Sequence, residues 1–403
     1  MKKTAFFQAL IILLLLLISW GFFYFKRLPQ AEQPDPEVTV ENQPAAPEHP
    51  EIETDSEPVV KDAGQSIGKI TNPETIPPLW DDWIQYLSGQ QTPAEMHLAL
   101  AAMKEALFSM EENDAMARLL ELMFSRVNVS TGLAFEIGEG GSLMGAPDLQ
   151  THLADWLGQL SPTRAAGLGK IALNKAGTNL GPDLFAIHLR NFANGTPPED
   201  PEKVAFIRQK FDQILDNPEW TGKPTHAVAE SMDFAVYLQQ GDLVAPLSEF
   251  ISPDGSPALG HAASLAVERL FDLNPVESGV SILQTIGEGA VNPAARAGFV
   301  ARLDPGNPAE LEILESYVRH PGVNPEEAGT FLKHFPNLNM TLSHNLLSPK
   351  ISITNMSSID QRLDNALQAV RAWLGDPGMS HLQQSLASTE ERLLRQMHGD
   401  PGP

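Results

Sequence analysis

The chain contains no cysteine at all. This absence excludes disulfide bonds, thiolate-ligated zinc, iron–sulfur clusters, lipid attachment to a cysteine and a thiol nucleophile. The eleven histidines do not compensate, because none forms a His-Glu-x-x-His motif or the paired spacing typical of zinc ligands. We therefore assign no cofactor, no metal ligand and no catalytic residue from the sequence.

Basic residues are scarce, with 27 Lys and Arg against 51 Asp and Glu, which gives a net charge of −24. The charge is uneven: residues 1–27 carry +4, residues 28–78 carry −9 and the remainder carries −19. A surface this acidic repels the phosphate backbone, so the sequence predicts no nucleic-acid binding. The acidity keeps the protein soluble, and among macromolecular partners it favours basic proteins.

Long apolar runs are also rare, and the one prominent run is AFFQALIILLLLLISWGFFYF at residues 5–25. About 21 residues at a rise of ~1.5 Å span the ~30 Å hydrocarbon core of a bilayer. Two basic residues flank the run on each side, and Trp20 and Tyr24 lie near one end, where amphipathic rings favour the interface. We predict that residues 1–27 form a single-pass signal-anchor in a bacterial inner membrane, with the acidic body in the periplasm.

A cleaved signal peptide is the alternative for this segment. The start MKKTA resembles bacterial export signals, and Ser19 and Gly21 supply small residues at positions −3 and −1 of a cleavage site. Cleavage there would make Phe22 the first residue of the mature chain. Against it, apolar residues continue to Phe25 and a basic pair follows. The anchor is the favoured interpretation.

Residues 28–78 contain ten prolines and eleven acidic residues. Proline fixes φ and removes backbone donors, and like charges repel, so we predict a disordered, extended linker. At ~3.1 Å per residue it would reach up to ~150 Å when fully extended. It is a spacer or, alternatively, a docking strip for a partner. Ser66 and Lys69 match the Ser-x-x-Lys pattern of acyl enzymes, but inside a linker we attribute the match to chance.

Residues 79–403 carry apolar side chains at helical spacing. Thr92-Pro93-Ala94-Glu95 is a capping box with proline at the first helical position. Apolar stripes follow at spacings of three and four, including Met96–Leu107, Val204–Ile214, Ile359–Leu374 and Leu382–Met397. These spacings predict an all-α fold with the stripes turned inward.

A capping residue followed by proline recurs along this part of the chain. Such a pair marks a helix start, because the side chain caps free N–H groups and proline at N1 loses no hydrogen bond. The pairs are Ser161-Pro162, Asp200-Pro201, Asn274-Pro275, Asn292-Pro293, Asn307-Pro308 and Asn324-Pro325. The last four capping residues are 18, 15 and 17 apart, so alternate ones are 33 and 32 apart. This spacing predicts a two-helix repeat of about 33 residues.

The repeat resembles the α-solenoids of HEAT-type or tetratricopeptide proteins. The Ala-rich stretch at residues 261–267 is similar to HEAT repeats, whereas the Trp, Leu, Gly and Tyr positions of tetratricopeptides are missing. The resemblance is best over residues 255–335 and implies a right-handed array of antiparallel helix pairs over residues 79–337. An irregular helical globule is the alternative. Residues 338–358 are an expected irregular crossover or hairpin, and residues 359–403 a final helix pair and tail.

Three sets of polar residues are candidate sites. Asp148, His152 and Asp155 lie at i, i+4 and i+7 on one helix face, where a solvent-exposed ion cluster is favoured over a metal or acid–base site. The Gly-rich stretch at residues 138–142 suits a helix–helix loop better than a phosphate cradle. Glu136 and Glu139 are too close along the chain for the two carboxylates of a glycosidase.

These observations together predict a membrane-anchored, non-enzymatic scaffold for protein–protein interactions in the bacterial envelope. Its partners would be proteins, with basic ones favoured by charge. Two alternatives stay open. One is an envelope hydrolase whose site forms only in the fold, and the other is a structural spacer in a secretion or cell-wall complex.

Overall fold

The computed structural model describes residues 81–90, 92–125, 128–175, 180–252, 255–287, 291–339, 345–347 and 358–398. All of them belong to one compact unit, Thr71–Pro403. The expected anchor at residues 1–27 and nearly all of the expected linker at residues 28–78 lie outside that unit, and both lie outside the described residues. Among the helices that are described, none is long and apolar enough to cross a membrane.

Most of the described residues are helical, which confirms the predicted all-α class. The first helices are α2 (Asp81–Ser88), α3 (Pro93–Phe108), α4 (Glu112–Phe124), α5 (Leu149–Leu160), α6 (Pro162–Lys175), α7 (Pro182–Gly195) and α8 (Lys203–Leu215). The middle helices are α9 (Pro218–Gly222), α10 (His226–Glu230), α11 (Asp233–Leu238), the 3-10 turn η4 (Gly241–Leu243), α12 (Val244–Ser248) and α13 (Pro257–Leu273). The last are α14 (Pro275–Gln284), α15 (Pro293–Val300), α16 (Pro308–Val318), α17 (Pro325–His334), α18 (Ile359–Leu374), η5 (Pro377–Leu382) and α19 (Gln383–Met397).

One small hairpin interrupts the helices. Strands β1 (Glu136–Ile137) and β2 (Leu143–Gly145) pair antiparallel, with the short 3-10 turn η2 (Glu139–Gly141) between them. The hairpin follows α4 and precedes α5 in the chain, and β1 contacts α10.

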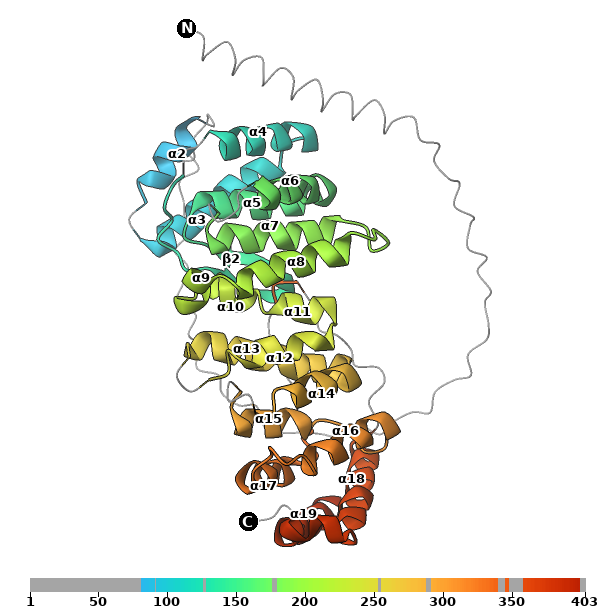
Figure 1. Ribbon diagram of the computed structural model, residues 1–403. Coiled ribbons are helices and arrows are strands. Elements are labelled where there is room, and N and C mark those ends of the chain that lie inside the picture. The colour runs from blue at the N-terminus through green and yellow to red at the C-terminus, as the bar shows by residue number, and fades with distance from the viewer. Residues whose placement is uncertain are drawn as a thin grey trace, which may run out of the picture. The chain divides into compact units, whose positions relative to one another are not determined.

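Helices pack mainly against their close neighbours in the sequence, so they stack in chain order from α4 to α19 (Figure 1). Helix α7 packs on α5 and α6, α8 on α7, α11 on α8, and α13 on both α10 and α11. The succession continues through α14, α15, α17 and α19. Each short helix therefore buries its apolar face only against the layers beside it, which is the property of helical-repeat proteins in general.

Apolar side chains fill two buried clusters, one around α2–α5 and a larger one from the hairpin to α19. The stripe from Met96 to Leu107 faces inward as predicted. Val204, Ile359 and Met397 were predicted to face inward and do not, being 46%, 62% and 39% exposed. All three lie in the first or last turn of their helices, where the neighbouring layer no longer covers them.

The predicted helix starts are mostly confirmed. Thr92 and Glu95 form the reciprocal capping box of α3, with N···O distances of 3.2 Å and 3.0 Å. Asn292, Asn307 and Asn324 each cap the helix that follows with a side-chain oxygen.

Two predicted starts differ in detail. Helix α8 begins at Lys203 rather than at Pro201, because Asp200 accepts a hydrogen bond from the Glu202 N–H and forms a turn before the helix. Helix α14 does begin at Pro275, but the side chain of Asn274 makes no cap bond and instead donates to the Gln239 carbonyl at 3.3 Å.

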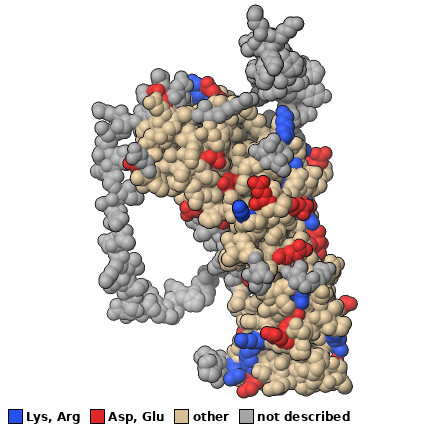
Figure 2. All heavy atoms as spheres, turned by 60° about the vertical axis from the view of Figure 1, so that its left-hand side comes forward, with Lys and Arg blue, Asp and Glu red and all other residues tan. Residues whose placement is uncertain are grey.

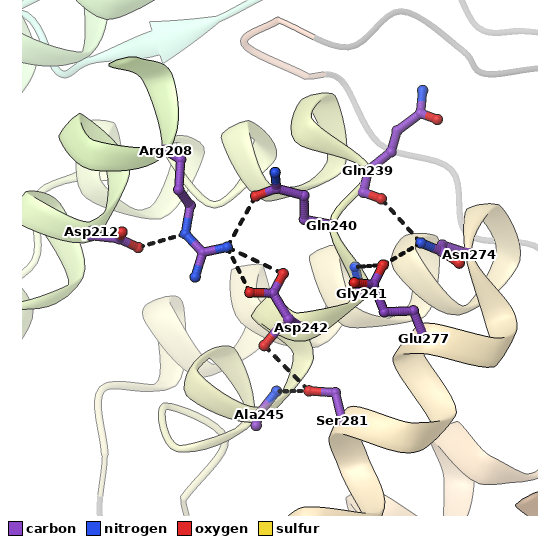
Figure 3. A network of polar contacts seen from close by, with 10 residues as sticks. All are labelled: Arg208, Asp212, Gln239, Gln240, Gly241, Asp242, Ala245, Asn274, Glu277 and Ser281. Carbon is purple, nitrogen blue, oxygen red and sulfur yellow. Dashed lines mark hydrogen bonds and ion pairs between the residues drawn. The ribbon is translucent and has the colours of Figure 1, made fainter. Parts of the chain in front are cut away.

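Polar contacts join successive layers where η4, which follows α11, packs against α14 (Figure 3). Arg208 of α8 binds Asp242 of η4 at 2.9 Å. The Gly241 N–H donates to the Glu277 carboxylate at 2.9 Å. Gly241 is required by this close approach, since a Cβ there would lie 2.5 Å from the Ser278 nitrogen.

Candidate functional site

A cavity of about 290 Å³ lies between α10, α11 and α13, with Asn345 at its edge. Three alanines of α13 at i, i+4 and i+8, Ala258, Ala262 and Ala266, face it. Their small side chains leave space that larger residues would fill. We call this cavity, together with the polar residues that line it, the α10–α13 groove.

The groove depends on how its helices are held. Helix α13 starts at Pro257, and the Ser256 hydroxyl caps its N-terminus. Helices α10 and α11 are each a few residues long and are separated by a turn at Ser231, whose hydroxyl donates to the Ala227 carbonyl at 2.7 Å. This turn puts residues of both short helices along the same side of α13.

Asp233 of α11 is the buried carboxylate of the groove, and its oxygens are bonded. One oxygen pairs with Arg269 of α13 at 2.9 Å, and the other accepts the N–H of Leu347 at 2.8 Å. The side chains of Asp233 and Arg269 are 6% and 11% exposed. Asp233 therefore links α11 to α13 and to residues 345–347, and the Asp233–Arg269 pair is electrically neutral.

Glu230, at the end of α10, is a second carboxyl in the same groove. Burial raises its pKa to about 7; the charge of Asp233 raises it further and His226 opposes the shift. Glu230 forms no hydrogen bond or ion pair with any residue that the structure describes. A half-buried carboxyl without a partner is uncommon, because desolvation of the charge is then not offset.

The lining of the groove is mainly apolar, with few polar groups. The rest of its polar lining is His261, Arg269 and Asn345, and the other lining residues are alanine, methionine, valine or leucine. Hydroxyl or amine nucleophiles are not among the lining residues. Within the described part of the chain there is also no group of three or more side chains arranged to hold a metal ion. A carboxyl with a pKa near 7 can exchange a proton or receive a cation.

The predicted cluster of Asp148, His152 and Asp155 does not form one site. The expected solvent-exposed ion cluster is wrong, because His152 and Asp155 are 3% and 1% exposed. Asp148 caps α5 by accepting the Thr151 N–H at 2.9 Å. Asp155 forms a buried ion pair with Arg190 of α7. The three residues thus serve the fold separately.

His152 is buried and neutral. Burial lowers its pKa to about 4, with a hydrogen bond to the backbone of Ala146 opposing the shift and the charge of Lys104 adding to it. Its Nε2 atom has no hydrogen-bond partner among the described residues. His188 of α7 is buried as well, and desolvation lowers its pKa to about 4.

The Gly-rich residues 138–142 form the turn of the β1–β2 hairpin and not the helix–helix loop that was predicted. Arg190 donates to the Gly141 carbonyl at 2.8 Å, so this turn is tied to the Arg190–Asp155 pair. Gly141 has a φ of 75°, which favours glycine, and its backbone lies against the Leu346 carbonyl. The residues act as a folding element. Glu136 lies exposed on β1, and the Ser66–Lys69 match lies outside the described residues.

Sequence reasoning missed Glu230. The available signal is its position three residues before Asp233 in the segment AVAESMDFAV, whose remaining residues are apolar except for Ser231. Charged residues inside an apolar segment are rarely buried without a function or a partner.

Comparisons with protein-family models, with curated proteins and with solved structures found no match to this chain.

Proposed function

We propose that this protein is a non-enzymatic scaffold of the bacterial envelope, tethered to the inner membrane by residues 1–27 and binding a partner protein in the periplasm. Its body would be a right-handed α-solenoid of antiparallel helix pairs. The Pro-rich residues 28–78 would provide reach from the membrane.

The observation that carries the proposal is the spacing of the buried polar bonds between layers. Arg190–Asp155 spans 35 residues, Arg269–Asp233 spans 36, Arg296–Glu327 spans 31 and Arg302–Asp272 spans 30. In a repeat array, neighbouring repeats contact each other across about one period, so equivalent bonds recur at that separation. These values bracket the 32–33 residues obtained from the Asn-Pro spacing.

Surface chemistry supports a protein partner over nucleic acid. In Figure 2, carboxylates are spread over much of the visible face of the described residues, with basic side chains among them. Stacked helix pairs in other repeat proteins present extended surfaces that bind protein segments.

The test is chemical crosslinking of the full chain in intact cells, followed by pull-down of the crosslinked species. We expect one or a few proteins to be recovered reproducibly. If nothing is recovered above a control strain without the chain, the scaffold proposal is wrong. Membrane fractionation and N-terminal sequencing test the tether separately, and a mature chain that starts at Phe22 would replace the anchor with a cleaved signal.

A hydrolase is a second candidate, and the raised pKa of Glu230 is the observation that favours it, since a general acid–base needs a pKa near the working pH. Hydrolysis of chromogenic esters, glycosides and amides by the purified chain, lost in the Glu230→Gln variant, would support it. We rank it second because the groove lining offers neither a nucleophile nor a second free carboxylate.

A further inference from the structure

We propose that the α10–α13 groove binds a lysine or arginine side chain of the partner protein, with Glu230 receiving its positive charge. This inference rests on the proposed scaffold function and names the chemistry that the scaffold recognises.

Other carboxylates that the fold takes out of solvent have bonded partners. Asp155, Asp233, Asp272 and Glu327 each pair with an arginine. Asp183 accepts a hydrogen bond from the Thr225 hydroxyl, and Glu310 accepts from the Asp304 N–H and the Asn307 amide. Glu230 is half-buried and has no partner of either kind among the described residues. A cation delivered by another molecule would supply the missing charge, and charge-assisted hydrogen bonds are the stronger kind.

Asp233 does not serve this purpose itself. Both of its oxygens are already bonded, to Arg269 and to the Leu347 N–H. Arg269 is likewise engaged and is 11% exposed, so the groove does not offer a free cation to an anionic ligand. The net charge available to a ligand is therefore that of Glu230.

The shape of the groove fits a long basic side chain. A volume of about 290 Å³ lies at the small end of ligand sites, at the scale of one or two side chains. Ala262, Leu265 and Met232 provide apolar walls, against which the methylene stem of lysine or arginine packs favourably. A bare metal ion would gain nothing from these walls and would find a single free carboxylate.

Binding should depend on pH in a defined direction. A cation binds the ionised form of Glu230, whose pKa in the free protein is about 7. Affinity should therefore rise as the pH increases from 6 to 8. His226, Asp233, His261 and Arg269 also face the groove or Glu230. Comparison of the wild type with Glu230→Gln isolates the part of the pH dependence that comes from Glu230.

The experiment uses the full chain in detergent micelles and four fluorescein-labelled hexapeptide pools. The pools are identical except for one fixed central residue, which is arginine, lysine, citrulline or norleucine. Anisotropy at pH 8 should show the arginine and lysine pools binding about tenfold more tightly than the two neutral pools. Glu230→Gln should reduce the affinity of the basic pools to that of the neutral pools and remove most of the dependence on pH.

Two further variants act as controls. Glu249→Gln removes one exposed carboxylate just after α12, with the same change in net charge, and should leave binding unchanged. Ala262→Leu fills the groove without altering its charge. It should weaken binding of the basic pools at least as much as Glu230→Gln does. Glu230→Gln relieves a buried charge, so its thermal unfolding midpoint should be no lower than that of the wild type, which excludes misfolding.

The proposal is overturned if citrulline and arginine pools bind equally, or if Glu230→Gln retains the affinity and its pH dependence. Repeating the crosslinking pull-down with Glu230→Gln separates the two proposals. If wild type and variant recover the same partner equally, the scaffold proposal stands and the groove proposal is wrong. If neither recovers a partner, both proposals are wrong.

Discussion

The α15–α17 layers and the α10–α13 layers both bury carboxylates, but they neutralise them differently. In the former, Glu327 receives two bonds from Arg296, at 2.7 and 2.8 Å, and one from the Tyr317 hydroxyl at 2.8 Å. In the latter, Asp233 is paired in a similar way, yet Glu230 beside it has no partner within the described structure.

This difference separates carboxylates that hold layers together from one that is available to a ligand. The Glu327 cluster joins α15, α16 and α17, and Arg296 also donates to the Thr285 carbonyl just after α14 at 3.2 Å. Burial and the nearby Glu327 charge raise the pKa of Tyr317, so its hydroxyl stays protonated and keeps donating. A cluster so fully bonded has no free acceptor for another molecule.

The largest expected effect follows removal of Arg296, because Glu327 is then a buried charge without its cation. Arg296→Ala should lower the free energy of unfolding by about 3–5 kcal/mol. Urea unfolding monitored by circular dichroism measures it. Replacing both partners, as in Arg296→Met with Glu327→Met, should cost less than Arg296→Met alone. Arg208→Ala breaks a more exposed pair, with side chains 28% and 54% exposed, and should cost about 0–1 kcal/mol. Equal losses of unfolding free energy in Arg296→Ala and Arg208→Ala would contradict the distinction between buried and exposed ion pairs.

The second effect concerns acid. His152 and His188 have pKa values of about 4 in the fold and about 6.5 when unfolded, so the unfolded chain binds more protons between these values. Stability should fall as the pH drops from about 6.5 to 4, by on the order of 3 kcal/mol for each histidine over the whole window. His188→Leu should flatten the slope of stability against pH over this window.

The destabilisation by acid should differ between the α5–α7 region and the α15–α17 region. Both histidines lie in α5 and α7, whereas the α15–α17 layers are held by the arginine pair. Protection factors from hydrogen exchange, which correct for the intrinsic effect of pH on the exchange rate, should therefore fall more in α5 and α7 than in α15 and α17 between pH 7.5 and pH 5. A uniform fall in protection along the chain would show that the two regions open as one unit.

A third effect lies at η4, the turn between α11 and α12, whose backbone packs against α14. Gly241→Ala should lower the free energy of unfolding by about 1–3 kcal/mol, since the new Cβ would collide with the Ser278 backbone nitrogen. Gly298→Ala is the matched control, because nothing lies within 4 Å of its Cβ position in α15. That control should be neutral or raise stability by about 0.5–1 kcal/mol. Thermal unfolding midpoints of both variants decide the point.

The smallest effect is the loss of one helix cap. The Asn324 side chain accepts the Glu327 N–H at 2.9 Å, so Asn324→Ala should cost about 1 kcal/mol. Asn324→Ser keeps a capping oxygen and should recover most of that loss. If serine is as destabilising as alanine, the cap is not what Asn324 contributes.

Helix starts were predictable because a cap acts within three or four residues. Thr92 and Asn324 cap their helices as their sequences indicate, and Pro at the next position adds the same information. The further starts at Asn217-Pro218 and Ser256-Pro257 follow the same pattern and went unrecognised. The prediction failed at Asp200, where the same side chain formed a turn with Glu202 instead of a cap.

The candidate sites were less predictable. The periodicity grouped Asp148, His152 and Asp155 on one face, but it did not reveal that α7 covers that face and supplies Arg190. Because this face is buried, the three residues do not form an ion cluster. Asp148 is a helix cap, His152 is neutral and Asp155 is in an ion pair.

The sequence by itself determined the helical class and most helix starts, since both arise from interactions within a few turns of chain. Only the tertiary structure decided which charges are buried and which of them are paired. Glu230 and Asp233 are three residues apart, yet the bonds that distinguish them come from Arg269 and from Leu347, which is 114 residues beyond Asp233. Desolvation and charge pairing depend on distances in space, and the spacing of residues along one helix does not reveal these distances.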